Sequence, residues 1–306
     1  YDVNNDKIYY RKKIAQYLNN DVDRKDYDNI VLESKNHYAS LNLDNNEMIV
    51  EGCEFFIISD AQIVNVYPLN EKVTVKKNRD MEFSGRIIAG LFDFVTHESH
   101  FNYDQFLIKM DDIDSLIMFV EDKNGQQNMY GEYPLVQVQS MIEDIAGILY
   151  IDMPHNKSGK IDNPKYPYFT CTDPGKVYYD KPQTFNRHYD RTKFFYQLDM
   201  FTITNLDNFE TDSIKFTGQL VSGGIFPDIR EPLKARPDFS LGFVHRTSES
   251  GLPCYEGKGN YAGVIDLSYR GLRGRKGTIN YLTSVTTSDS LVFYLDSCNA
   301  SVKNHT

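Results

Sequence analysis

The sequence predicts a mainly β protein of repeated strands, and two observations lead to this fold class. The chain has 22 Tyr and 19 Phe but no Trp, and aromatic side chains are enriched in strands because flat rings pack well on a pleated surface. Residues 81–92 read MEFSGRIIAGLF and residues 214–226 read IKFTGQLVSGGIF, so nearly the same strand-like phrase occurs twice. We therefore expect an elongated, irregular repeated-strand architecture, either β-solenoid-like or made of stacked curved antiparallel sheets.

The first residues differ in pattern from the rest of the chain. In residues 11–18, RKKIAQYL, the apolar residues Ile14, Tyr17 and Leu18 stand at i, i+3 and i+4, which predicts a short helix. A charged stretch over residues 21–28 follows. Residues 1–30 are thus expected to be a short helical and charged lead-in.

From about residue 31 the pattern changes to alternation with a period of two. Residues 40–43 (SLNL) and 72–76 (KVTVK) alternate polar and apolar side chains, which is typical of a strand with one buried face. The acidic run 111–114 (DDID) lacks the glycine of a calcium loop and is interpreted as a solvated turn. Residues 31–152 are expected to form a first β module.

The two copies of the repeated phrase align with each other without a gap. In each copy an aromatic residue, a glycine and an aliphatic residue alternate, and a glycine within a strand usually marks a bulge or a close backbone approach. A third, fainter copy begins at Tyr261. The predicted structural repeat positions are Phe83, Gly85, Ile87, Phe216, Gly218, Leu220, Tyr261, Gly263 and Ile265.

A second phrase, Asp-Ser followed by alternating apolar residues, begins at Asp114, Asp212 and Asp289. Aspartate and serine bond nearby backbone amides in turns, so each copy is interpreted as a turn that starts a strand. The copies are unevenly spaced, which argues against a regular solenoid with a fixed period.

A proline-rich segment separates the two halves. Residues 153–182 contain Pro154, Pro164, Pro167, Pro174 and Pro182, and proline at that density predicts a loop or hinge rather than a central strand. Residues 183–306 are then expected to form a second β module. The chain begins with Tyr1 rather than Met and ends without a recognisable signal, so we expect it to be a slice of a much longer protein.

The charge balance excludes one class of partner. The net charge is −10 and the pI is near 5.2, so no nucleic acid partner is expected. The nearest basic run, Arg270, Arg273, Arg275 and Lys276, is interrupted by glycines and is interpreted as a solvated turn between strands. No apolar run is long enough for a transmembrane segment.

No set of residues predicts a catalytic, metal or cofactor site, and no cofactor is expected. The cysteines, Cys53, Cys171, Cys254 and Cys298, lack zinc-ligand spacing, and their disulfide state stays open. One charged cluster is a weak candidate for lyase-like chemistry: Arg187, His188, Asp190 and Arg191. Four tyrosines would stack on sugar rings if they were exposed: Tyr166, Tyr168, Tyr178 and Tyr179.

Several phrases resemble a family of very long proteins from Bacteroidetes. The resemblance runs from about Ala39 to Asp296 and rests on FSGRIIAGLFDF, SGGIFPDI, PDFSLGF and YEGKGNYAGVIDLSYRGLRG followed by YLTS. The family pattern has an acidic residue after GLRG where this chain has Arg275, so no ion site is expected there. The resemblance implies an exported, envelope-associated chain, and the family has no established activity that would assign functional residues.

Three functions remain open at this point. The first is a non-enzymatic structural or interaction scaffold of the bacterial cell envelope, with other envelope proteins or surface glycans as partners. The second is a glycan-binding or carbohydrate-active β-solenoid module. The third is a lipid-binding groove of an envelope transport protein. All three imply an extracytoplasmic location, and none fixes the oligomeric state.

Overall fold

The computed structural model describes residues 38–180 and 189–305. The chain is mainly β, and its strands pair in antiparallel sheets. The described residues divide into two compact units. Unit 1 comprises residues 38–137, 143–174 and 200–211, and unit 2 comprises residues 138–142, 175–180, 189–199 and 212–305. The predicted helix over residues 11–18, within the lead-in 1–30, lies outside the described residues.

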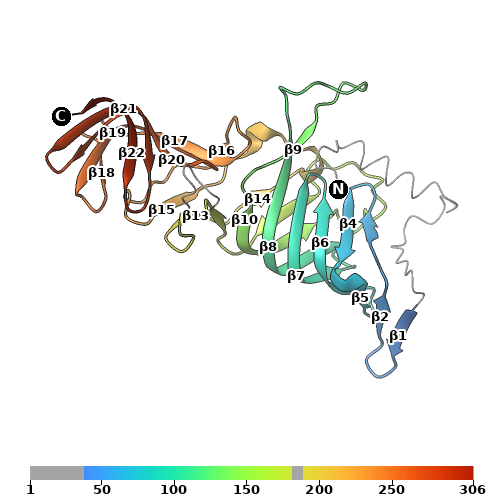
Figure 1. Cartoon of the computed structure of the whole chain (residues 1–306). Coiled ribbons are helices and arrows are strands. Elements are labelled where there is room, and N and C mark those ends of the chain that lie inside the picture. Colours follow the sequence, from blue (N-terminus) through green and yellow to red (C-terminus); the bar gives the residue numbers. More distant parts are fainter. Residues whose placement is uncertain (1–37, 181–188, 306) are drawn as a thin grey trace. The chain divides into compact units, whose positions relative to one another are not determined.

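Unit 1 is built around a curved sheet in the order β1-β2-β5-β6-β7-β8-β10 (Figure 1). The pair β3-β4 joins through β4 to β6, β9 pairs with β8, and β11 connects β10 to β14. The strands are β1 (Tyr38–Asn42), β2 (Glu47–Glu51), β3 (Phe56–Ser59), β4 (Val64–Pro68), β5 (Lys72–Val75), β6 (Met81–Ala89), β7 (Phe92–Asn102), β8 (Leu107–Glu121), β9 (Leu135–Gln137), β10 (Ile142–Tyr150), β11 (Tyr168–Cys171) and β14 (Thr202–Ile203). Two 3-10 turns, η1 (Leu69–Glu71) and η3 (Leu206–Asn208), complete it.

Aromatic rings fill the core of unit 1. The rings of Phe94 and Phe169 lie 4.9 Å apart, and those of Phe56 and Phe83 meet edge to face at 5.5 Å. All four side chains are almost fully buried. Such pairs add about 0.5–1.5 kcal/mol each beyond the burial of their area. The phenylalanines that suggested strands from composition are therefore the residues that hold this sheet together.

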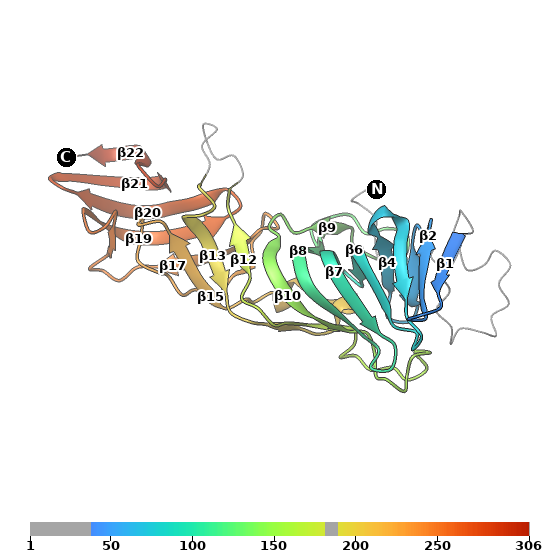
Figure 2. The same ribbon diagram turned by 90° about the horizontal axis from the view of Figure 1, so that it is seen from below.

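Unit 2 contains a run of three paired strands and a larger, seven-stranded sheet. The three paired strands are β12 (Lys176–Tyr178), β13 (Phe194–Leu198) and β15 (Gly218–Ser222), with η4 (Thr211–Ser213) before β15. In the larger sheet the order is β16-β17-β19-β20-β21-β22, and β18 pairs with β19. Figure 2 labels β17, β19, β20, β21 and β22 of this sheet. Its strands are β16 (Lys234–Ala235), β17 (Leu241–Arg246), β18 (Leu252–Cys254), β19 (Gly259–Ser268), β20 (Gly271–Tyr281), β21 (Ser284–Phe293) and β22 (Cys298–His305).

Strands β3 to β8 of unit 1 and strands β16 to β21 of unit 2 are connected in the same way. In each set the first strand pairs with the second, and the second and third both pair with the fourth. The fourth, fifth and sixth strands then form an antiparallel meander. The registers of the paired strands agree as well. In unit 1, one cross-strand row contains Tyr67, Arg86, Val95 and Ser115. The equivalent row of unit 2 contains Arg246, Val264, Arg275 and Ser290.

The glycines of the repeated phrase share a backbone conformation. Gly85, Gly218 and Gly263 have φ values of 136°, 154° and 159°, a region that L side chains rarely adopt. A Cβ at Gly85 would overlap the carbonyl oxygen of Tyr67, and a Cβ at Gly218 would overlap that of Gln197. Glycine is required at these two positions because the neighbouring backbone leaves no room for a side chain.

The other repeat positions are apolar and buried. The aromatic side chains Phe83, Phe216 and Tyr261 are at most 6% exposed, and the aliphatic side chains Ile87, Leu220 and Ile265 are fully buried. Within unit 2, the ring of Tyr261 meets Phe293 edge to face at 5.2 Å and lies over Gly274 and Gly277.

The Asp-Ser phrase does not form turns in two of its three copies, which corrects the prediction. Asp114 lies within β8 and Asp289 lies within β21, each at a register shift between paired strands. The third copy, at Asp212, belongs to η4. A bulge inserts an extra residue into a strand, so a polar pair fits there without entering the core. The acidic run 111–114 is likewise part of β8 rather than a turn.

The proline-rich segment 153–182 contains two short strands, β11 and β12, as well as loop. Pro167 comes directly before β11, and Pro174 lies between β11 and β12. Neither proline therefore has to donate a hydrogen bond to the sheet, which is the condition under which proline is tolerated beside strands. Within residues 38–180 and 189–305, no helix has the length and apolar character needed to span a bilayer.

Candidate functional site: the arginine face of unit 2

Four arginines gather on one face of the larger sheet of unit 2. Arg246 on β17 and Arg275 on β20 stand in the same cross-strand row, on either side of Val264. Arg273 is two residues before Arg275 and so points to the same face. Arg236 follows β16 and reaches the same place, because its Nη2 lies 2.9 Å from Oδ1 of Asp266 on β19. We call these four side chains the arginine face.

Asp266 is the acidic residue in the middle of this face. It is 3% exposed and sits directly opposite Arg273 in the strand pairing. Besides the contact with Arg236, its Oδ2 lies 2.5 Å from Nη2 of Arg275. A carboxylate is costly to bury unless it is paired, and here two guanidinium groups share one carboxylate. The positive charge of the face exceeds the negative charge at its centre.

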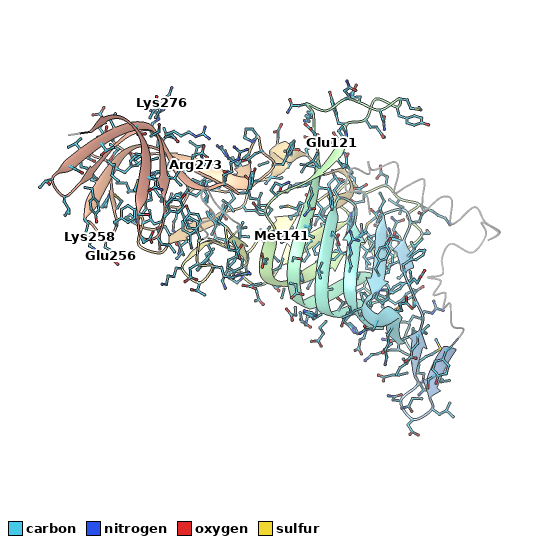
Figure 3. All side chains as sticks on the ribbon, viewed as in Figure 1. Glu121, Met141, Glu256, Lys258, Arg273 and Lys276 are labelled. Atoms are coloured by element: carbon cyan, nitrogen blue, oxygen red, sulfur yellow. The ribbon has the colours of Figure 1, made fainter. Side chains whose placement is uncertain are left out.

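The arginines differ in exposure. The side chain of Arg275 is 62% exposed and Arg246 is exposed, whereas the side chain of Arg236 is 20% exposed. Figure 3 labels Arg273 together with Lys276, which follows Arg275 on β20. The charges of Arg246 and Arg275 are therefore exposed to solvent, whereas Arg236 and Asp266 form a more buried ion pair beneath them.

Charge is distributed unequally between the two units. Among the described residues, unit 1 has 10 Lys or Arg and 24 Asp or Glu, a net charge of 10 − 24 = −14. Unit 2 has 14 Lys or Arg and 12 Asp or Glu, a net charge of 14 − 12 = +2. The acidic pI of the whole chain thus conceals a unit that is slightly basic and carries an arginine face.

The basic run 270–276 was interpreted from the sequence as a solvated turn, and this interpretation is wrong for most of it. Only Arg270 lies in the turn, since β20 begins at Gly271 and includes Arg273, Arg275 and Lys276. The glycines of the run are strand residues: a Cβ at Gly274 or Gly277 would come within 3 Å of the Tyr261 ring. Arg273 and Arg275 stand at alternate positions, and this spacing could have predicted a strand with one basic face.

The weak candidate cluster is only partly described, because Arg187 and His188 lie outside the described residues. Asp190 accepts hydrogen bonds from the backbone N–H and the hydroxyl of Thr192, and the hydroxyl hydrogen bond lowers the pKa of its carboxyl. Arg191 stacks over the Tyr178 ring at 3.8 Å and lies 3.5 Å from Asp180. Asp190 therefore stabilises the turn before β13, whereas Arg191 contacts Tyr178 on β12 and Asp180.

The four tyrosines proposed as sugar platforms have different environments. Tyr179 is 1% exposed and donates a hydrogen bond to the carbonyl of Leu241, so it belongs to the core of unit 2. In unit 1, Tyr168 stacks on Tyr150 at 4.5 Å and lies 5.0 Å from Tyr166. Tyr166, Tyr168 and Tyr178 are half-buried. Among these four described rings, only Tyr166 and Tyr168 contact each other, and Tyr178 lies against Phe195 and Arg191.

The four cysteines are free thiols. Burial raises the pKa of Cys53, Cys171 and Cys254 to about 11 each and that of Cys298 to about 12. They are therefore protonated at neutral pH. In the part of the chain that the structure describes, no three His, Cys, Asp or Glu side chains gather as metal ligands would.

Comparisons with protein-family models, with curated proteins and with solved structures found no match to this chain.

Proposed function

We propose that the chain is a non-enzymatic interaction scaffold of the bacterial cell envelope, which binds an acidic protein surface through the arginine face of unit 2. The observation that carries this proposal is the excess of guanidinium groups around the buried Asp266. Arginine suits such a role because its planar donors match carboxylates and it is enriched in protein interfaces. The extracytoplasmic location rests on the sequence resemblance.

The acidic surface that the molecule itself offers is unit 1, with its net charge of −14. We infer that unit 2 of one copy binds unit 1 of the next. A contact between two different surfaces of the same protein is heterologous, so it repeats in series unless it closes into a ring. This would make the chain a building block of an extended scaffold, and the repeated strand phrases would serve its rigidity.

Sedimentation velocity tests the proposal. At an ionic strength of about 0.01 M the Debye length is about 30 Å and at about 1 M it is about 3 Å. We expect the sedimentation coefficient to rise with protein concentration at the low ionic strength and to stay constant at the high one. The variant Arg246→Glu should weaken this association at least about tenfold.

Lys258→Glu is the matched control, because it makes the same change of charge in unit 2 but lies in the turn before β19 (Figure 3). It should leave association almost unchanged. A wild-type chain that stays monomeric at low ionic strength would contradict the self-association, as would equal losses in Arg246→Glu and Lys258→Glu. Binding of an acidic polysaccharide by such a monomer would instead assign the face to a surface glycan.

The lipid-groove alternative has less support from the described residues. The inner face of the larger sheet is occupied by Tyr261 and Phe293, both fully buried and in ring contact. An acyl chain would need an open apolar channel where these rings lie.

A further inference from the structure

Unit 2 contains a half-open pocket that is separate from the arginine face. Its volume is about 300 Å³, at the lower end of the roughly 300–1,000 Å³ range of small-ligand sites. Ile279 and Tyr281 on β20, and Ser284 and Thr286 on β21, line it. Because Ile279 pairs with Thr286 and with Tyr261, the pocket lies on the inner face that carries Tyr261, opposite to the arginines.

The pocket results from small side chains at this end of the sheet. Large rings fill the inner face farther along the sheet, but near the β20–β21 turn the inner positions are the small residues Ser284 and Thr286. On β22, another small residue, Ala300, is also part of the wall. Small side chains on neighbouring strands leave a volume that no core residue occupies.

One tyrosine ring forms a supported wall of this pocket. Tyr281 is 37% exposed and meets Tyr255 edge to face at 6.2 Å. A Cβ at Gly259 would lie 3.0 Å from the Tyr281 ring, so glycine leaves room for that ring against β19. Tyr255 is itself fixed by the hydrogen bond that its hydroxyl donates to the carbonyl of Ser297, at 2.8 Å. The Tyr281 ring is therefore held from behind, with part of its surface open.

The polar groups of the wall indicate the chemistry of a ligand. They are the hydroxyls of Ser284, Thr286 and Ser297 and the carboxylate of Asp296, and the wall contains no Lys, Arg or His. A phosphate or carboxylate ligand would meet a negative charge without a compensating cation. A neutral ring with many hydroxyl groups fits, because its hydroxyls can donate to the carboxylate while its C–H face packs on an aromatic ring.

We propose that this pocket binds one neutral pyranose residue of a glycan, with its ring stacked on Tyr281 and a hydroxyl donating to Asp296. This site is independent of the proposed self-association, because it lies on the other face of the sheet and uses no arginine. It adds a second type of recognition to unit 2, in which an uncharged sugar is bound by shape and hydroxyl groups.

Saturation-transfer NMR with glucose, galactose, mannose and N-acetylglucosamine as separate probes tests the proposal. We expect transfer to at least one of these sugars in the wild-type chain. Tyr281→Ala should weaken binding about tenfold, Tyr281→Phe should retain it because the ring is kept, and Asp296→Asn should weaken it less than Tyr281→Ala. A larger residue at Gly259, as in Gly259→Val, should also weaken binding by displacing the ring.

Tyr269→Ala is the control, because Tyr269 lies in the β19–β20 turn of the same unit and is not a wall residue. Far-ultraviolet circular dichroism and the thermal midpoint establish that each variant is folded. Should Tyr281→Ala fail to fold, the comparison of Tyr281→Phe with Asp296→Asn decides in its place. Absence of transfer from all four sugars, or equal transfer in Tyr281→Ala and the wild type, would overturn the proposal. Sedimentation behaviour should be the same in all the pocket variants, so the two proposals can fail separately.

Discussion

The meander β6-β7-β8 of unit 1 and the meander β19-β20-β21 of unit 2 have the same connections and register but opposite charge patterns. In unit 1, Arg86 on the first strand pairs with Asp93 on the second, with Nη2 2.5 Å and Nε 2.6 Å from Oδ2. In unit 2 the acid, Asp266, is on the first strand and Arg275 is on the second. The ion pair therefore joins the other two diagonal positions of the equivalent hairpin, with the acid and the arginine exchanged between the two strands.

The two meanders also differ in how many arginines contact the buried aspartate. In unit 1 one arginine meets one aspartate, and Arg86 also lies over the Tyr67 ring at 5.9 Å. In unit 2 two arginines, Arg236 and Arg275, contact Asp266. Arg246 and Arg273 stand at neighbouring positions of the same face. Close packing restricts which side chains can occupy the inner face of both meanders, whereas the charges on the outer face differ between them. The outer face is consequently where the two units differ in what they can bind.

The largest expected effect comes from removing the central acids. Asp93→Asn and Asp266→Asn each remove a buried carboxylate from arginines that are partly exposed. Breaking a fully buried pair costs roughly 3–5 kcal/mol, and the cost here is lower where the arginine reaches solvent. Because two arginines contact Asp266 and one contacts Asp93, we expect Asp266→Asn to be the more destabilising change. Urea unfolding followed by circular dichroism measures both. A smaller effect at Asp266 would mean that the arginines of unit 2 do not depend on it.

The next effect in size concerns the glycines of the repeated phrase. Gly85→Ala in unit 1 and Gly218→Ala in unit 2 combine an unfavourable φ with overlap on a neighbouring carbonyl, and each should cost roughly 2–4 kcal/mol. Gly131→Ala is the control, since Gly131 has φ of 80° but nothing lies within 4 Å of its Cβ position. It should cost about 1 kcal/mol. Equal effects at all three glycines would show that φ alone, not the close strand approach, explains the repeated glycine.

The smallest effect is a difference in alkaline stability. Burial raises pKa values in both units, with Cys53, Tyr168 and Cys171 affected in unit 1. In unit 2 the affected groups are Tyr179, Tyr196, Cys254, Tyr255, Tyr261 and Cys298. A raised pKa means that the folded state holds the proton more tightly, so the stability it confers is full below the unfolded pKa and is lost as pH rises. Unit 2 should therefore weaken more than unit 1 between about pH 9 and pH 11.

Alkylation of buried thiols in mild urea measures this difference. Cys53 in unit 1 and Cys254 in unit 2 are matched reporters, because both are at most 1% exposed and both have a pKa of about 11. We expect Cys254 to become reactive at the lower pH. Earlier reaction of Cys53 would contradict the assignment of unit 2 as the more pH-sensitive unit.

The inner face of the fold follows more directly from the sequence than the outer one. Alternation and the phrase around Gly85 and Gly218 predicted strands because buried side chains must recur every second residue. The Asp-Ser phrase misled because a bulge accommodates the same residues as a turn. The arginine face could not be assembled from the sequence, since Arg236, Arg246 and Asp266 meet only through strand pairing between distant segments. The pocket around Tyr281 depends on the same long-range register.

The central claim is that the arginine face is the binding surface, and modification of arginines with phenylglyoxal, read out by mass spectrometry, tests it most directly. The wild-type chain would be compared dilute and concentrated, both at about 0.01 M ionic strength. We expect Arg246 and Arg275 to become less reactive in the concentrated sample, while the exposed residue Arg230 of the same unit does not change. Unchanged reactivity of Arg246 and Arg275, or equal protection of Arg230, would contradict the central claim.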